Sequence, residues 1–199
     1  PGLRFAFLEG GVAWGANLHS DILGHFEKRN AKSIANYDPA ELDRAQFEKL
    51  LREFAPKQVA ERADRLDYAL AMLSDPDEDR AGIDEFVQSG VRDARDVAEI
   101  FSKQFFFGCE ADDPMNAIAF DPALNPGGTR LRAVFASDIG HWDVPDCREV
   151  LPEAWELVED GHLDEADFRA FVFENAVDLL TGTNPDFFRG TAVEAAVRK

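Results

Sequence analysis

The stretch that decides the fold is LRFAFLEGG, residues 3–11. It is short, rich in apolar residues and ends in paired glycines, which is typical of a buried strand that leads into a tight turn. Residues 12–30 then carry apolar side chains at helical spacing, at Leu18, Ile22 and Phe26. A strand, a glycine turn and a helix in this order form the βα unit of a parallel sheet.

Two further apolar runs predict strands, QFFFGCEA at 104–111 and LRAVFASD at 131–138. Helical patterns follow both runs, so the chain belongs to the α/β class and its strands should be parallel neighbours. An open doubly wound sheet and a (β/α)8 barrel both contain such units, and no GxGxxG motif follows any of the strands. The expected strands are residues 3–9, 104–109 and 132–137.

The middle of the chain, residues 31–100, is charged and mostly helical in pattern, without a Gly/Ser linker or a repeat. Asp38 is a candidate N-cap with Pro39 at the first helical position. A second helix is expected at 57–73, so residues 38–75 should be at least half helical. We interpret 31–100 as a helical insertion or cap within a single unit of residues 1–199.

Helices are also expected after the second and third strands. Asp113 and Pro114 form the start signal of a short helix that runs to residue 120. Two helices should close the chain, one at 147–161 and one at 164–182, with Gly182 marking the end of the second.

The composition excludes several classes of protein. The net charge is −18, from 39 acidic and 21 basic residues among 199, and this sign disfavours binding to nucleic acids and to anionic membranes. No apolar run approaches the ~20 residues that a membrane-spanning helix needs. Cys109 and Cys147 are too few for a disulfide framework, so we expect two small buried residues in a reducing cytoplasm.

Carboxylates stand at the carboxyl ends of all three predicted strands, where α/β proteins bind their ligands. They are Glu9, Glu110 and Asp138. A carboxylate at the end of a buried strand needs an open rim, a partner or a cation. We expect Glu9 and Asp138 to project from the same end of the sheet, with their Cα atoms about 10–13 Å apart because one strand lies between them. For Glu110, which stands beside the stretch ADD at 111–113, a role as a loop cap is favoured.

Three motifs carry a resemblance to a known family. They are Glu9-Gly10-Gly11 with Trp14, Ser137-Asp138 with His141, and Asn175-Ala176. In this order, and at the ends of predicted strands, they resemble the C-terminal half of the amidohydrolase-related metal-dependent hydrolases. The branch in question includes aminocarboxymuconate semialdehyde decarboxylase and related ring-acid decarboxylases.

The resemblance implies a distorted (β/α)8 barrel, of which this chain supplies strands six to eight. The N-terminal half of the barrel would come from the same or another chain, since the chain begins directly in an apolar run and is expected to be incomplete. The implied activity is hydrolysis or decarboxylation of a small carboxylic acid or amide by metal-activated water or acid/base chemistry. A cytoplasmic homo-oligomer is expected.

The resemblance also implies roles for site residues. Asp138 would bind a divalent metal, most simply zinc, and shuttle a proton. Glu9 would act as an acid/base group or hydrogen-bond the substrate, and His141 would orient or contact the substrate. The remaining substrate-binding residues would be Gly10, Gly11, Trp14 and Trp142.

Two departures from the family pattern matter. Many members have His at the position of Glu9, and the His-x-His pair of the first barrel strand lies outside this chain. His19, His25 and His162 are expected at the surface, and His141 could also be a turn residue packed on Trp142. Two alternatives therefore stay open. One is a non-catalytic half-barrel that binds a partner subunit, and the other is a self-contained doubly wound domain with a Mg²⁺ site at Glu9 and Asp138.

Overall fold

The computed structural model describes residues 2–35, 38, 42–73 and 84–197. The chain divides into two compact units, one formed by the residues up to Leu23 together with those from Asp93 onward, the other by residues 24–92. The predicted insertion at 31–100 overlaps most of the second unit. The two units are described separately below.

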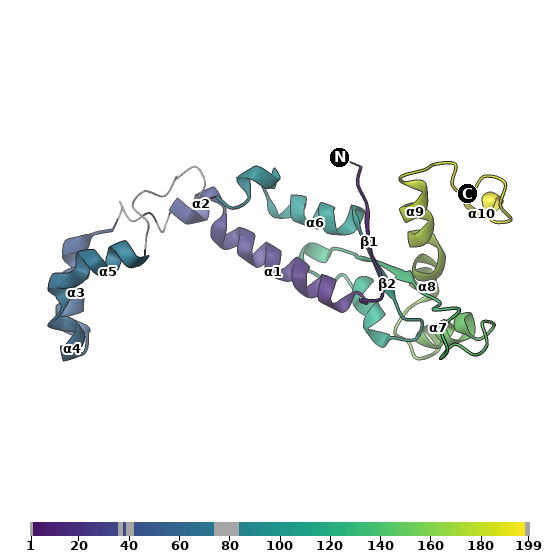
Figure 1. Cartoon of the computed structure of the whole chain (residues 1–199), viewed down its shortest axis with the longest axis horizontal. Coiled ribbons are helices and arrows are strands. Elements are labelled where there is room, and N and C mark those ends of the chain that lie inside the picture. Colours follow the sequence, from purple (N-terminus) through teal and green to yellow (C-terminus); the bar gives the residue numbers. More distant parts are fainter. Residues whose placement is uncertain (1, 36–37, 39–41, 74–83, 198–199) are drawn as a thin grey trace. The chain divides into compact units, whose positions relative to one another are not determined.

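A three-stranded parallel sheet forms the centre of the first unit (Figure 1). Its strands are β1 (Phe5–Phe7), β2 (Phe105–Cys109) and β3 (Arg132–Phe135), in the order β1-β2-β3. Phe107 lies opposite Phe7 on one side and opposite Ala133 on the other. The prediction of three parallel neighbouring strands is confirmed, although β1 and β3 are shorter than expected. The expectation that the first strand is buried is wrong, because Phe5 and Ala6 of β1 are exposed.

One face of the sheet packs against helices α1 (Ala13–Arg29) and α6 (Ala94–Lys103). The rings of Phe7 and Phe107 contact Trp14 of α1, with centroids 5.1 Å and 5.4 Å from it. Gly15 lies against Phe107 so closely that a Cβ there would overlap the ring. On α6, Phe101 packs edge-on against Phe105 at 5.0 Å. These aromatic contacts hold α1 and α6 to the sheet.

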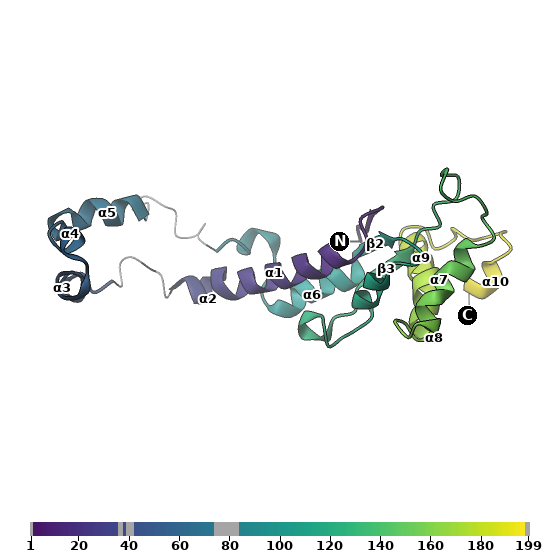
Figure 2. The ribbon, with the colours of Figure 1, turned by 90° about the horizontal axis from the view of Figure 1, so that it is seen from below.

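The opposite face contacts helix α9 (Asn175–Thr181) through charged side chains. Arg4 and Arg132 both pair with Asp178 of α9, and both guanidinium groups lie over the ring of Phe106 at about 5.5 Å. Figures 1 and 2 show α9 and α6 on opposite sides of the sheet. Helices against both faces are the arrangement of an open α/β sheet, whereas the inner face of a barrel packs against the barrel's other strands.

The two edges of the sheet differ. At β3, the buried side chain of Asn175 donates a hydrogen bond of 2.8 Å to the carbonyl oxygen of Ala133. At β1, the side chains of Leu3, Phe5 and Leu8 are exposed by 66%, 46% and 78%. Within the described residues, β1 is therefore the edge at which another strand could pair.

The remaining helices of the first unit follow the strands in the predicted order. Asp113 caps the 3₁₀ helix η6 and accepts a hydrogen bond from the backbone of Met115, as expected. The helix predicted at 164–182 contains a π-helical turn, η8, in its middle. Gly182 ends it in a right-handed conformation, next to the side chain of Arg4. The bounds are η6 Pro114–Ala119, η7 Pro126–Gly128, α7 Val150–Glu159, α8 Glu165–Arg169, η8 Ala170–Glu174 and α10 Glu194–Val197.

The described part of the second unit is largely helical and contains no β-hairpin, in agreement with the prediction. Its first long helix starts later than expected, because Asp43 and not Asp38 caps it by accepting a hydrogen bond from the backbone of Gln46. Pro39 lies outside the described residues. The single helix predicted at 57–73 is divided into three pieces. The bounds are α2 Ala31–Ile34, α3 Arg44–Phe54, α4 Lys57–Ala60, η3 Ala63–Arg65, α5 Leu66–Leu73 and η5 Val87–Ser89.

Among the described residues, none of the helices combines the length and the apolar character that crossing a bilayer requires.

Candidate functional site

The two carboxylates that the sequence singled out share an unusual backbone conformation. Glu9 has φ +57° and Asp138 has φ +49°, and no other non-glycine residue in the described part of the chain has a positive φ. This left-handed region costs most L-residues about 1–2 kcal/mol. Backbone strain of this kind concentrates at functional sites. Both residues follow the carboxyl end of a strand, Glu9 after β1 and Asp138 after β3.

The loop after β3 brings three potential ligands together. The backbone N–H of His141 donates to the carbonyl oxygen of Asp138 at 3.1 Å, and the His141 Nδ1 atom lies 2.7 Å from Asp138 Oδ2. Gly140 permits the turn with φ +110°. One donor atom each of Asp138, His141 and Asp143 lies within 4.8 Å of the other two. His141 and Asp143 are exposed and Asp138 is half-buried.

The turn that carries Glu9 is fixed by its two glycines. The N–H of Gly11 donates to the carbonyl oxygen of Gly108 at 3.1 Å, and Gly11 has φ +63°. A Cβ at Gly10 would lie 2.9 Å from the indole nitrogen of Trp14. The glycines therefore let the turn after β1 pass close to β2 and to α1. Trp14 is 39% exposed and packs on Phe7, while Trp142 is 92% exposed. Their roles in substrate binding stay predictions.

Glu110 follows the central strand β2, and its pKa is affected by the negative charges at the carboxyl end of the sheet. Its pKa is raised above the usual range, first by burial and then by the negative charges of Asp138, Asp112, Glu9 and Asp143. The carboxylates after β1, β2 and β3 thus repel one another, as expected if they project from the same end of the sheet. Such a field favours the uptake of a proton or a cation. Glu110 therefore belongs to the same electrostatic group as the two predicted carboxylates.

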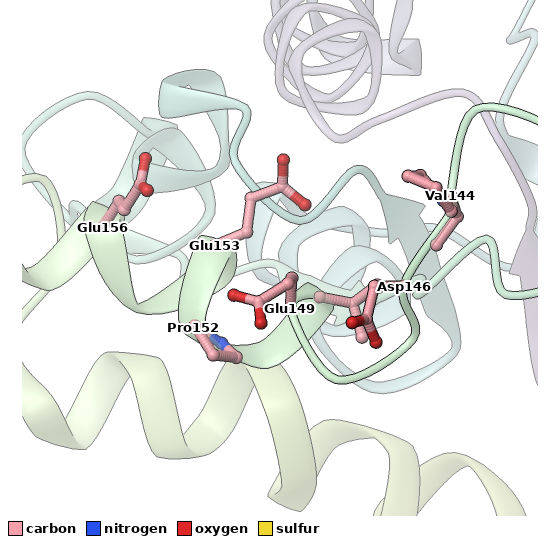
Figure 3. A pocket seen from close by; sticks show the side chains of 8 residues that line it. Val144, Asp146, Glu149, Pro152, Glu153 and Glu156 are labelled. Carbon is pink, nitrogen blue, oxygen red and sulfur yellow. The ribbon is translucent and has the colours of Figure 1, made fainter.

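A pocket of about 330 Å³ lies beside this loop, between residues 144–146 and helix α7. Figure 3 shows that carboxylates surround it, those of Asp146, Glu149, Glu153 and Glu156. Asp146 pairs with Arg148 at the pocket's edge. The lining of this pocket repels anions, so we do not assign it to a carboxylate substrate.

The remaining histidines and cysteines are placed as follows. His19 is fully buried, which contradicts its expected surface position, and His25 and His162 are exposed as predicted. Cys109 is buried, and burial raises the pKa of its thiol to about 12, so it is not a nucleophile. Cys147 is exposed, contrary to prediction. The alternative that His141 packs on Trp142 is also wrong, because Trp142 is 92% exposed.

The strain at Glu9 can be measured with two substitutions that both remove the carboxylate. We expect the Glu9→Gly protein to be about 1 kcal/mol more stable than the Glu9→Ala protein, because only glycine adopts φ +57° without cost. At a position of ordinary φ the order is reversed, with glycine the less stable. Urea unfolding of the two proteins measures the difference. Equal stability, or greater stability of the alanine protein, would show that the left-handed backbone carries no strain.

Asp143, two positions after His141, is a candidate ligand that was not predicted from the sequence. The turn at Asp138, which the sequence does not specify, is what brings its carboxylate to the other two groups. Comparisons with models of known protein families, with curated proteins and with solved structures found no match to this chain.

Proposed function

We propose that this chain forms part of a metal-dependent hydrolase or decarboxylase related to the amidohydrolases, acting on a small carboxylic acid or amide. The observation that carries the proposal is the group formed by Asp138, His141 and Asp143, whose donor atoms lie within 4.8 Å of one another at the carboxyl end of β3. The left-handed backbone of Asp138 and Glu9 supports it, because strain is maintained where function requires a geometry.

The donor set fits a divalent transition metal. One imidazole nitrogen and two carboxylate oxygens are ligands that Zn²⁺ accepts, and catalytic zinc sites use three protein ligands with one position left open. The surrounding negative charge, which raises the pKa of Glu110, also favours a cation. In this proposal Asp138, His141 and Asp143 hold the metal. When bound, a divalent metal activates a water molecule and polarises the substrate's carbonyl or carboxylate group.

The chain's own residues then have separate tasks. Asp138 accepts and returns a proton, because a carboxylate at a strand end is held rigidly and has a second oxygen available. Asp138 also orients the imidazole of His141 through the contact of 2.7 Å between them. Glu9, at the end of β1, serves as the second acid/base group or hydrogen-bonds the substrate. Its negative charge helps to raise the pKa of Glu110, which follows the neighbouring strand β2.

The proposal includes further strands supplied by an N-terminal half, in the same or another chain. The exposed apolar side chains along β1, Leu3, Phe5 and Leu8, support pairing at this edge. The non-catalytic alternative is that this chain only binds a partner subunit at this edge and catalyses no reaction. The proposed compartment is the cytoplasm, in keeping with Cys147, an exposed thiol without a disulfide partner.

One observation favours a second candidate, a self-contained open α/β domain that binds Mg²⁺ through Glu9 and Asp138. Helix α9 covers the face that a barrel would turn inward, and Asn175 closes the β3 edge. Magnesium prefers oxygen ligands and octahedral geometry. This candidate therefore needs no participation of His141, which separates it from the first.

The experiment is a Zn²⁺ titration of the complete protein with ¹⁵N-labelled histidine. We expect the ring nitrogen signals of His141 to shift on addition of Zn²⁺, and those of His162 to stay unchanged. The Asp138→Asn and Asp143→Asn proteins should bind Zn²⁺ at least tenfold more weakly, since each lacks a ligand oxygen with full charge.

The matched control is Asp146→Asn, which removes a carboxylate of the neighbouring loop that pairs with Arg148 and lies outside the group. Its Zn²⁺ affinity should equal that of the parent. Unchanged His141 signals in excess Zn²⁺ would refute the zinc proposal. If Mg²⁺ then bound and Asp138→Asn abolished that binding, the second candidate would hold instead.

A further inference from the structure

His19 is a buried titratable group that the proposed chemistry does not use. It lies on α1, its side chain is 0% exposed, and its ring stacks on Phe101 of α6 with centroids 4.7 Å apart. Neither ring nitrogen has a hydrogen-bond partner among the described residues. A neutral imidazole tolerates this apolar position better than an imidazolium, whose charge would be buried without a partner.

The charged residues of the two helices do not offer such a partner. On α1, Asp21 accepts a hydrogen bond from Asn17. On α6, Glu99 pairs with Lys103, Asp96 accepts from the backbone of Asp93 in a capping box, and Arg95 pairs with Asp93. The pKa of His19 is lowered below its ordinary value, and burial is the cause, without a contribution from any of these charges.

The position of His19 links its charge to the candidate site. One turn before it on the same face of α1, Gly15 lies against the ring of Phe107. At the start of the helix, Trp14 packs on Phe7 and lies against Gly10 in the turn after Glu9. The packing of α1 on the sheet therefore also holds the turn that carries Glu9.

We propose that His19 is an acid-sensitive switch, whose protonation loosens α1 from α6 and the sheet and thereby releases the Glu9–Gly11 turn. The inference goes beyond the proposed function and does not depend on a bound metal. An unfolded or detached α1 binds a proton near pH 6.5, the ordinary pKa of histidine, whereas the packed helix binds it only at lower pH. The packed state is thus fully stable above pH 6.5 and loses stability as the pH falls from there towards the lowered pKa. Over this window the equilibrium constant for opening rises up to tenfold per pH unit.

The test combines two measurements on the complete protein. Titration of ¹⁵N-labelled histidine should give His19 a pKa below 6.5, the ordinary value of histidine. Amide hydrogen exchange, corrected for the intrinsic effect of pH, should show that the protection of residues 8–23 falls about tenfold between pH 7.5 and pH 5.0. In the His19→Phe protein, which keeps an aromatic ring against Phe101 but cannot be protonated, the protection should change less than twofold.

The matched control is His162→Phe, which should retain the parent's pH dependence. The switch is wrong if His19 titrates at or above pH 6.5, if protection of residues 8–23 is independent of pH, or if His19→Phe loses as much protection as the parent. Should His19→Phe fail to fold, the titration and the exchange of the parent protein decide between these outcomes by themselves.

Discussion

The Asp138→Asn substitution is expected to lower turnover by at least ~10²-fold while the fold is kept. A carboxylate that exchanges a proton with the substrate is typically worth 10²–10⁴-fold, and an amide cannot take up that proton at neutral pH. Asparagine has nearly the same shape and also tolerates a left-handed backbone such as φ +49°. Loss of stability is therefore not the expected route to the loss of activity.

Turnover is measured on the complete protein, with the best substrate from a panel of small carboxylic acids and amides. Asp146→Asn is the control, because it removes a carboxylate from the neighbouring loop without touching the Asp138 group. Circular dichroism and urea unfolding check that the fold is retained. If Asp138→Asn turned over substrate within a few-fold of the parent, both roles proposed for Asp138, metal binding and proton transfer, would be wrong.

The Phe107→Ala substitution is expected to destabilise the protein by about 3–5 kcal/mol, the usual range for removal of a fully buried phenylalanine. Phe107 is 0% exposed and contacts Phe7, Trp14 and Gly15, so it joins β1, β2 and α1. Its loss leaves a cavity where these three elements meet. The turn that carries Glu9 connects β1 to α1, so it joins two of these three elements.

Urea unfolding measures the difference, with Phe187→Ala as the control. Phe187 is 48% exposed at the surface of the same unit, and its removal should cost about 0.5 kcal/mol. A cost of less than 1 kcal/mol for Phe107→Ala would mean that α1 is not packed on the sheet as described. It would also remove the basis for coupling His19 to the site.

The three strands could be predicted from the sequence because each reads as a continuous apolar run, although only β2 is buried along most of its length. Their ends could not be predicted to the residue. In β1 the ladder stops at Phe7, two residues before Glu9 turns left-handed, and the apolar Leu8 lies beyond it. An apolar run marks the presence of a strand, while backbone hydrogen bonds determine where it ends.

The inner face of α1 was predicted in part, since Phe26 is buried as expected. Helical spacing pointed to Leu18, but Leu18 is 38% exposed and His19 is fully buried. The helix turns this face inward because Gly15 accepts the ring of Phe107, and His19 follows one turn later. A glycine and a histidine carry little weight in a hydrophobic pattern, so periodicity alone did not show that Gly15 and His19 belong to the inner face.

The start of helix α3 also could not be predicted from residue types alone. Asp38 and Asp43 are both suitable N-caps by residue type, and Pro39 favoured the first. The hydrogen bond from Gln46 to the side chain of Asp43 decides the start of α3. The candidate site was found in part, because the approximate position of each strand end can be predicted from the sequence. The place of Asp143 beside Asp138 depends on a turn geometry that residue types do not specify.

We propose that Asp138, His141 and Asp143, whose donor atoms lie close together, hold a catalytic divalent metal. The most direct measurement is the metal content of the complete protein, purified without added metal or chelator and analysed by mass spectrometry beside its Asp138→Asn and Asp146→Asn variants. We expect about one zinc or similar transition metal per chain in the parent and in Asp146→Asn, with a clear loss in Asp138→Asn. A parent protein without bound metal, or an Asp138→Asn variant that retains the parent's full content, would contradict this proposal.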